Sequence, residues 1–136
     1  MTIRIAMWSG PRNISTAMMR SFGARPDCAV VDEPFYAAYL AGTGLDHPMR
    51  DAVLAAQPQD WRAVVAALET LEAPVIYEKQ MAHHMLPGFG LDWTVERRNG
   101  FLIRDPAQVL ASYAAKRAEV TLDDIGAVRQ RELFER

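Results

Sequence analysis

A short run of residues near the N-terminus has the composition of an anion-binding loop. The apolar segment at 3–8 is followed by Ser9 and Gly10. Six loop residues come next: Pro11, Arg12, Asn13, Ile14, Ser15 and Thr16. If a helix begins near Ser15, the free amides of its first turn and the positive end of its dipole lie at one place. Arg12 adds a full positive charge, and Ser15 and Thr16 add hydroxyl donors for phosphate oxygens. The pattern predicts an anion site, although a plain strand-to-helix turn capped by Ser15 or Thr16 would use the same residues.

This loop lacks the Gly-Lys-Ser/Thr end with which nucleoside triphosphatases hold phosphate and magnesium. A divergent P-loop nucleotide or small-molecule kinase would need that end, together with a strand-terminal Asp for magnesium. We therefore keep a kinase as an alternative function, and we expect no metal at this loop.

A second candidate anion site lies in the stretch FLIRDPAQVLASY. Arg104 follows an apolar segment, and Ser112 comes eight residues later within the expected next helix. A guanidinium and a hydroxyl at this spacing could hold one phosphate between them. An Arg-Asp pair is also common at the start of a helix for purely structural reasons.

Short apolar segments that alternate with helical patterns must position these residues. Strands are expected at 3–8, 28–32, 74–78 and 100–104, because each segment is rich in Val, Ile or aromatic residues and ends in polar or turn residues. Helices are expected at 60–72 and after the cap pairs Asp105-Pro106 and Thr121-Asp124. This alternation predicts an α/β fold with a parallel sheet covered on both faces. Binding residues then belong at the C-terminal ends of the strands. One candidate follows each expected strand, and the four are Arg12, Glu33, Lys79 and Arg104.

The composition excludes several classes of protein. The chain has 136 residues, 50% hydrophobic and 24% charged, with a formal net charge of -2. That charge gives no general attraction to nucleic acid or to an anionic membrane. Cys28 is the only cysteine, which excludes an internal disulfide and a thiolate zinc site. The sequence has no signal-peptide pattern and no apolar run of roughly 18 residues, so we expect a cytoplasmic protein.

The two motifs together resemble the sulfotransferases that use 3′-phosphoadenosine 5′-phosphosulfate (PAPS). In that family, a loop of the type Pro-Lys/Arg-Ser/Thr-Gly-Thr/Ser-Thr follows the first strand, and residues 11–16 are similar to it. The family's second motif is an Arg, often within Arg-Asp-Pro, followed eight residues later by a Ser, as Arg104 and Ser112 are here. The resemblance implies a P-loop-like three-layer sandwich. It also implies a loop that binds the 5′-phosphosulfate and an Arg104-Ser112 pair that grips the 3′-phosphate.

The same resemblance implies catalytic roles for residues between the motifs. Glu33-Pro34 stands where the glycan-modifying branch has Glu-Pro, whose Glu acts as the base on the acceptor hydroxyl. Lys79 stands where many members have a Lys that contacts the phosphosulfate, so Arg12 and Lys79 would neutralise charge on the leaving phosphate. Glu33 could instead be a cap or an ion-pair partner. His83 is the fallback base, because Met81 occupies the position of the His that other members use.

Two departures from the family pattern affect the expectations for this chain. Asn13-Ile14 replace a small residue and a glycine, and the family's C-terminal Gly-rich, Lys-containing segment is absent. We therefore expect one sulfotransferase-like domain over residues 1–136 that lacks a C-terminal portion, and a non-catalytic phosphonucleotide-binding domain is a further alternative. The partner would be a small-molecule acceptor with a hydroxyl or amine, held by loops at 35–60 and 80–95. The oligomeric state stays open.

Overall fold

The fold is built on a parallel sheet. The computed structural model describes residues 1–116, 119 and 121–136, and for residues 122 and 123 it describes the backbone. The strands are β1 (Ile3–Ser9), β2 (Cys28–Asp32), β3 (Val75–Met81) and β4 (Arg98–Phe101). They lie in the order β2-β3-β1-β4, and all the pairs are parallel. The α/β fold class predicted from the sequence is confirmed.

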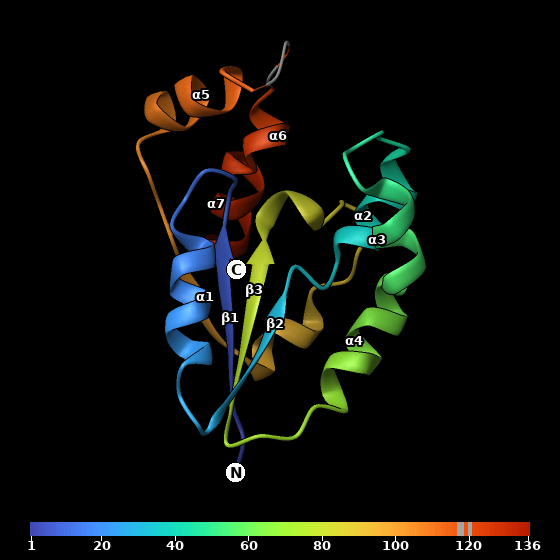
Figure 1. Ribbon diagram of the computed structural model, residues 1–136, viewed down its shortest axis with the longest axis vertical. Coiled ribbons are helices and arrows are strands. Elements are labelled where there is room, and N and C mark those ends of the chain that lie inside the picture. The colour runs from blue at the N-terminus through green and yellow to red at the C-terminus, as the bar shows by residue number, and fades with distance from the viewer. Residues whose placement is uncertain (117–118, 120) are drawn as a thin grey trace.

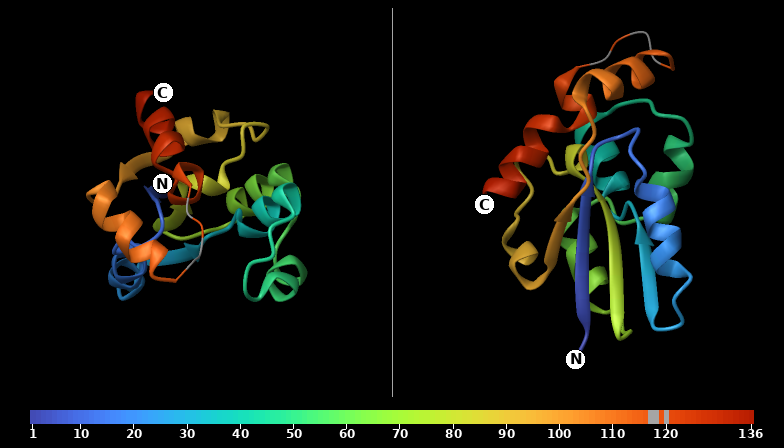
Figure 2. Two further views of the ribbon diagram at one scale, coloured as in Figure 1. Left: turned by 90° about the horizontal axis from the view of Figure 1, so that it is seen from above. Right: turned by 90° about the vertical axis from the view of Figure 1, so that its left-hand side faces the viewer.

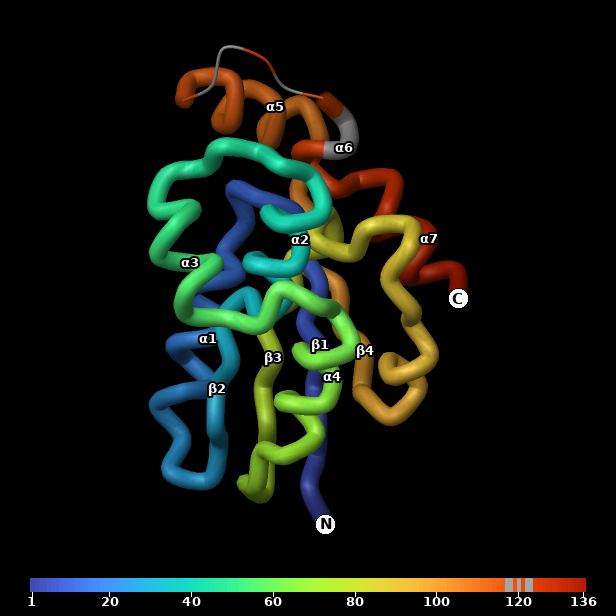
Figure 3. Tube along the Cα trace, turned by 90° about the vertical axis from the view of Figure 1, so that its right-hand side faces the viewer, coloured from blue at the N-terminus to red at the C-terminus, as the bar shows by residue number. Residues whose placement is uncertain are grey.

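Helices cover both faces of this sheet (Figure 1). The α-helices are α1 (Ser15–Gly23), α2 (Tyr36–Thr43), α3 (Arg50–Ala56), α4 (Trp61–Glu69), α5 (Pro106–Ala114), α6 (Leu122–Ile125) and α7 (Ala127–Glu135). The 3₁₀ helices are η1 (Ala82–His84) and η2 (Asp92–Glu96). Helix α1 lies on one face, and α2, α3 and α4 lie on the other. Figure 2 shows the strands side by side, and Figure 3 shows α2 to α4 in front of them.

Local signals placed the starts of α4 and α5 correctly. Asp60 caps α4, because its Oδ1 accepts a hydrogen bond of 2.7 Å from the Arg62 amide. Asp105 caps α5 in the same way through the Ala107 amide at 2.8 Å. The sequence did not predict α2 and α3, because each has only seven or eight residues and no clear apolar stripe.

Two predicted strand boundaries were wrong. β3 continues to Met81, so Lys79 lies inside the strand and not after it. Polar residues at 78–80 suggested an end there, yet they are buried with ion-pair and hydrogen-bond partners. β4 lies two to three residues earlier than the predicted strand at 100–104, so Arg104 belongs to the connection that leads into α5.

The side chains of β3 alternate between the two faces of the sheet. Tyr77 and Lys79 face α1: the Tyr77 ring stacks on Phe22 with centroids 4.4 Å apart, and Lys79 Nζ lies 3.2 Å from Thr16 Oγ1. Glu78 points to the other face and is fully buried. The strand period therefore aims Lys79 at the N-terminal turn of α1.

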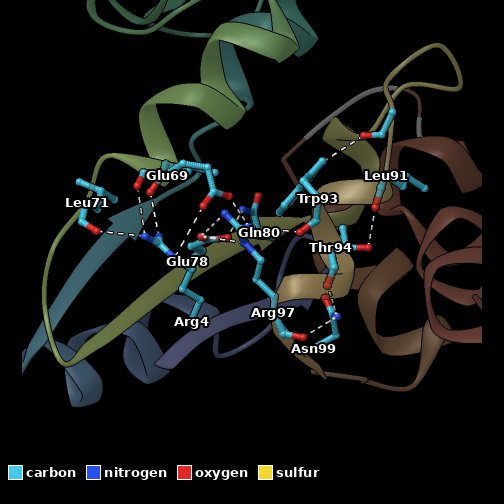
Figure 4. Close-up of polar contacts among 12 residues, drawn as sticks. Arg4, Glu69, Leu71, Glu78, Gln80, Leu91, Trp93, Thr94, Arg97 and Asn99 are labelled. Atoms are coloured by element: carbon cyan, nitrogen blue, oxygen red, sulfur yellow. Dashed lines mark hydrogen bonds and ion pairs between the residues drawn. The ribbon is translucent and has the colours of Figure 1, made fainter. Parts of the chain in front are cut away.

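A buried polar network holds β3 from the other face (Figure 4). Arg97, whose side chain is fully buried, makes ion pairs with Glu78 at 3.3 Å and with Glu69, and it donates to the Trp93 carbonyl at 3.1 Å. Arg4 donates to a carbonyl at the end of α4. Burial raises the pKa of Glu78, while Arg97 acts in the opposite direction. The network ties β1 and β3 to α4 and to η2, whose C-cap is Arg97.

The hydrophobic core lies on this same face. It includes Trp8, whose side chain is 1% exposed and whose indole Nε1 donates to Asn99 Oδ1 at 2.9 Å. The cluster contains ten buried residues, namely Ala6, Trp8, Phe35, Ala38, Val64, Leu68, Ala82, Met85, Trp93 and Leu133.

The corner between α6 and α7 packs on two loops at the C-terminal edge of the sheet. A Cβ atom added to Gly10 would lie 2.2 Å from the carbonyl oxygen of Ile125. Gly126 has a φ of 68°, and a Cβ atom there would lie 3.0 Å from the amide nitrogen of His83. The corner therefore lies against the loop after β1 and against η1 after β3.

The close contact at Gly10 predicts a large effect of a small substitution. Gly10→Ala is expected to lower the free energy of unfolding by about 1–3 kcal/mol, because a backbone oxygen cannot rotate away as a side chain can. Gly88→Ala is the control, since a Cβ at Gly88 meets nothing within 4 Å. Urea unfolding of the two variants measures the difference, and equal stabilities would show that the corner does not press on Gly10.

Candidate active site

The loop that enters α1 is shaped to present backbone amides. Arg12 has a φ of 62°, in the left-handed region, and the Asn13 side chain donates from Nδ2 to the Gly10 carbonyl at 3.1 Å. The N-cap residue of α1 is Ile14, and no side chain caps the helix. The prediction that Ser15 or Thr16 caps this helix is therefore wrong. The first amides of α1 have no acceptor within the helix and can receive an anion.

Arg12, Arg104 and Ser112 lie together beside this loop. Arg12 Nε donates to Ser112 Oγ at 2.9 Å, and Arg104 Nη1 donates to the Arg12 carbonyl at 2.7 Å. Arg12 and Arg104 are exposed, and Ser112 is partly exposed. The structure brings together the two motifs that lie 92 residues apart in the chain. The hydroxyl of Ser112, however, contacts Arg12 here, whereas the motif pairs it with Arg104.

Lys79 forms a second charged group at the same helix end. Its Nζ atom lies 3.0 Å from Asp32 Oδ1, 3.9 Å from Glu33 Oε2 and 3.2 Å from Thr16 Oγ1. The Lys79 side chain is 7% exposed, so its ammonium group is almost removed from bulk water. A buried ammonium needs partners of this kind. Thr16 lies in the first turn of α1, and so the lysine is held beside the free amides.

Glu33 lies in an unusual position for a glutamate. Its φ is 46°, in the left-handed region, and its amide continues the β2–β3 pairing through a 3.0 Å hydrogen bond to the Lys79 carbonyl. Burial raises the pKa of Glu33, Lys79 acts in the opposite direction, and Asp32 adds to the increase. A left-handed glutamate costs about 1–3 kcal/mol, and such residues gather at functional sites. A carboxyl with a raised pKa is suited to accept a proton.

The fallback base His83 lies elsewhere on the same edge of the sheet. It belongs to η1, directly after β3, and its ring lies 5.4 Å from that of Tyr39 in α2. His83 lines a cavity of about 420 Å³ between α2, the segment after η1 and α7. The cavity wall thus includes parts of both regions, 35–60 and 80–95, that the sequence assigned to the acceptor.

Two residues that were not predicted from the sequence as site residues also lie at this site. Asp32 makes the shorter of the two ion pairs with Lys79. Its position directly before Glu33 in the sequence could have identified it as a candidate. Gln57 donates to the Glu33 carbonyl at 3.2 Å and lies at the end of α3. No local pattern marks Gln57, because its contact spans 24 residues.

Acidification is expected to destabilise the protein through His84. This side chain is 1% exposed, and neither ring nitrogen has a hydrogen-bond partner among the residues that the structure describes. Burial lowers the pKa of His84 well below the usual range, and His83, His47 and Lys79 add to the effect. The unfolded chain would bind a proton here below about pH 6.5, whereas the folded chain would not. Stability should therefore fall as the pH drops below that value, by roughly 1 kcal/mol per pH unit.

His84→Phe tests this prediction. Phenylalanine keeps an aromatic ring against Tyr36 and Tyr39, whose ring centroids lie 4.8 and 4.9 Å from that of His84. The variant should lose this part of the pH dependence in urea unfolding between about pH 5 and 8. An unchanged slope would mean that His84 does not take up the proton on unfolding.

The fold and the site together define the class of α/β proteins that bind an anion at the start of the first helix. A parallel α/β sheet presents free amides at the start of its first helix, and cations from the loop after β1, from β3 and from the segment after β4 lie around them. A family model described as a sulfotransferase domain matches residues 3–136. The chain belongs to this sulfotransferase family, and its fold is the family's P-loop-like fold.

Two plant proteins share part of the sequence. Branched-chain-amino-acid aminotransferase-like proteins 2 and 1 of Arabidopsis thaliana are each 36% identical to this chain over 111 residues. The match covers 80% of this chain and 20% of each relative, so the chain spans about a fifth of the length of the relatives it matches. No solved structure matches the chain.

Two kinds of feature are absent from the residues that the structure describes. None of their helices is both long and apolar enough to cross a membrane. Nor does the described part of the chain contain a group of three or more His, Cys, Asp or Glu side chains arranged to hold a metal ion.

Proposed function

We propose that this domain transfers a sulfuryl group from PAPS to a hydroxyl or amine of a small-molecule acceptor. One observation carries the proposal: the N-terminal end of α1 has a cationic group on each side and a partly buried glutamate next to one of them. Arg12 and Arg104 form the first group, and Lys79 forms the second, with Glu33 3.9 Å from its Nζ atom. Family membership supports the reaction class.

The residues present fit a donor with two phosphate groups. PAPS carries a 5′-phosphosulfate and a 3′-phosphate and supplies an activated sulfuryl group when bound. The free amides of α1, with Lys79 and Thr16, fit the first anion, and Arg104 and Ser112 fit the second. Arg12 belongs to the loop before α1, and its contacts with Ser112 and Arg104 join that loop to the second set. Asn13 does not compete for the anion, because its side-chain amide is turned back to Gly10.

The roles of the remaining side chains follow from charge. Arg12 and Lys79 would place positive charge where the departing phosphate gains negative charge, which is the effect of a preorganised donor. Glu33 would accept the proton that the acceptor hydroxyl or amine loses as its bond to sulfur forms. The products would be adenosine 3′,5′-bisphosphate and a sulfated acceptor.

The acceptor belongs in the cavity of about 420 Å³ that His83 lines. Its wall combines apolar side chains, such as Leu45 and Leu86, with Tyr39 and His83. The wall also includes charged residues of α6 and α7, such as Arg129, so an alcohol or amine with an apolar body and a polar or charged group fits this lining.

Calorimetric titration of the purified chain tests the donor site. Adenosine 3′,5′-bisphosphate is expected to bind without magnesium and more tightly than ATP with magnesium. The reverse preference would support a kinase, and binding of neither would contradict the proposal. Incubation with PAPS and a panel of phenols, alcohols and amines then tests turnover; binding without turnover would support a non-catalytic phosphonucleotide-binding domain.

A further inference from the structure

The strained backbone of Glu33 needs an external restraint. A glutamate with a φ of 46° would relax to an extended or helical conformation unless neighbouring groups held it. On one side, its amide is held by the Lys79 carbonyl of β3 at 3.0 Å. The Glu33 carbonyl accepts from the Tyr36 amide at 3.1 Å, a local turn contact. The second contact of that carbonyl comes from a distant part of the chain.

The carboxamide of Gln57 supplies this distant contact and a further one. Its Nε2 atom donates to the Glu33 carbonyl at 3.2 Å, and its Oε1 atom accepts from the Ala37 amide at 3.1 Å. Ala37 lies in the first turn of α2, whose amides have no acceptor within the helix. One side chain therefore bridges the strained residue and the helix that follows it.

The chemistry of this bridge requires a primary amide. A carboxamide carries both a donor and an acceptor, whereas a carboxylate only accepts and a thioether bonds weakly. The position is also restrained: Gln57 ends α3 in an extended conformation, with φ −126° and ψ 154°, and Pro58 follows. Its side chain is half-buried, so water competes only partly for the two hydrogen bonds.

We propose that Gln57 is a positioning residue, whose carboxamide clamps the left-handed backbone of Glu33 to α2 and thereby keeps the Glu33 carboxylate beside Lys79. The assignment of Glu33 as the base rests on the proposed function. The clamp itself rests on contacts of Gln57 alone. Without it, the backbone at Glu33 relaxes, and the carboxylate leaves its partly buried position for solvent.

The test compares two substitutions at Gln57 with a matched control. Gln57→Met keeps a side chain of similar length and removes both hydrogen bonds, and Gln57→Glu keeps only the acceptor for the Ala37 amide. Gln59→Met is the control, because Gln59 is an exposed glutamine whose Nε2 donates to the Leu54 carbonyl at 3.2 Å, away from Glu33. Circular dichroism first establishes that each variant is folded.

The first readout is the titration of the Glu33 carboxyl followed by NMR in the whole chain. In the wild type, burial and Asp32 raise the pKa of Glu33 and Lys79 lowers it, with burial the largest effect. Gln57→Met should lower that pKa toward the range of a solvent-exposed glutamate, and Gln59→Met should leave it unchanged. An unchanged Glu33 titration in Gln57→Met would overturn the proposal. Gln57→Glu is judged by kcat, because its added charge itself raises the pKa of Glu33. A wild-type kcat in Gln57→Glu would also overturn the proposal, because the contact with Ala37 would then suffice.

The second readout is steady-state transfer from PAPS. Because a misplaced reacting group can lower the rate by as much as about 100-fold, we expect kcat to fall by about 10-fold or more in Gln57→Met. The Kd of adenosine 3′,5′-bisphosphate should stay the same, since Gln57 contacts none of the residues assigned to the phosphates. Equal losses of kcat and of bisphosphate binding would point to general damage and overturn the proposal. If the wild type neither binds the bisphosphate nor transfers sulfate, the proposed function fails, while the NMR titration still decides the role of Gln57.

Discussion

Replacing Glu33 with glutamine is expected to lower kcat for sulfate transfer by about 10²- to 10⁴-fold, the usual contribution of a positioned general base. Glutamine has nearly the same shape, but it cannot accept the proton that the acceptor loses. The Kd of adenosine 3′,5′-bisphosphate should hardly change, because Glu33 lies beside Lys79, whereas Arg12 contacts Ser112 and Arg104. Turnover and calorimetry on the same preparation measure the two effects.

The control for this variant is Glu72→Gln, which makes the same chemical change at an exposed glutamate outside the site. Full activity in Glu33→Gln would show that Glu33 is not the base. His83→Gln would then be the next variant to examine, because His83 lines the cavity assigned to the acceptor.

The pH dependence of kcat is a second test of Glu33 as the general base. Glu33 must be ionised to accept a proton, so the rate should rise with pH as Glu33 loses its own proton. Burial raises the pKa of Glu33, so this acid limb should lie at a higher pH than an exposed glutamate would give. The limb should disappear in Glu33→Gln.

Arg104→Ala is expected to weaken the binding of adenosine 3′,5′-bisphosphate by roughly 10- to 100-fold, the cost of losing about 1.5–3 kcal/mol of charge-assisted hydrogen bonding. Part of the loss comes from the ligand contact. The rest comes from the Arg12 carbonyl, which loses the 2.7 Å hydrogen bond that ties the loop to the segment before α5. Arg12→Ala should also weaken binding, because it removes the neighbouring charge and the contact with Ser112.

Arg98→Ala is the matched control for Arg104→Ala. Arg98 is an exposed arginine on β4, so the change in net charge is the same while the loop after β1 is untouched. Calorimetric titration at one fixed salt concentration compares the variants. Equal losses in Arg98→Ala and Arg104→Ala would mean that overall charge, and not the site, governs binding.

Much of the fold could be predicted from the sequence because its signals are local. Apolar runs identified β1, β2 and the first part of β3, and the run at 100–104 overlapped only the end of β4. Asp60 and Asp105 marked the starts of α4 and α5 through hydrogen bonds to amides two residues ahead. The parallel order of elements placed the candidate residues at one edge of the sheet. Helices α2 and α3 were missed because they are too short for a periodic pattern.

Tertiary structure alone decided how the site residues pair. The register of β3 against β1 and β2 turns Lys79 toward α1. There Lys79 forms an ion pair with Asp32 and donates a hydrogen bond to Thr16. The position of α5 beside the loop after β1 lets Ser112 accept a hydrogen bond from Arg12, whereas the motif pairs Ser112 with Arg104.

The sequence by itself determined the residue types at the ends of the strands, the start of α1 near Ser15 and the class of fold. It did not determine the clamp of Gln57 on Glu33 or the close approach of Ile125 to Gly10, contacts that join residues 24 and 115 positions apart. Caps, turns and apolar periods depend on neighbours within a few residues, so they can be read along the chain. Contacts between distant segments depend on how whole elements pack, and only the folded chain specifies that packing.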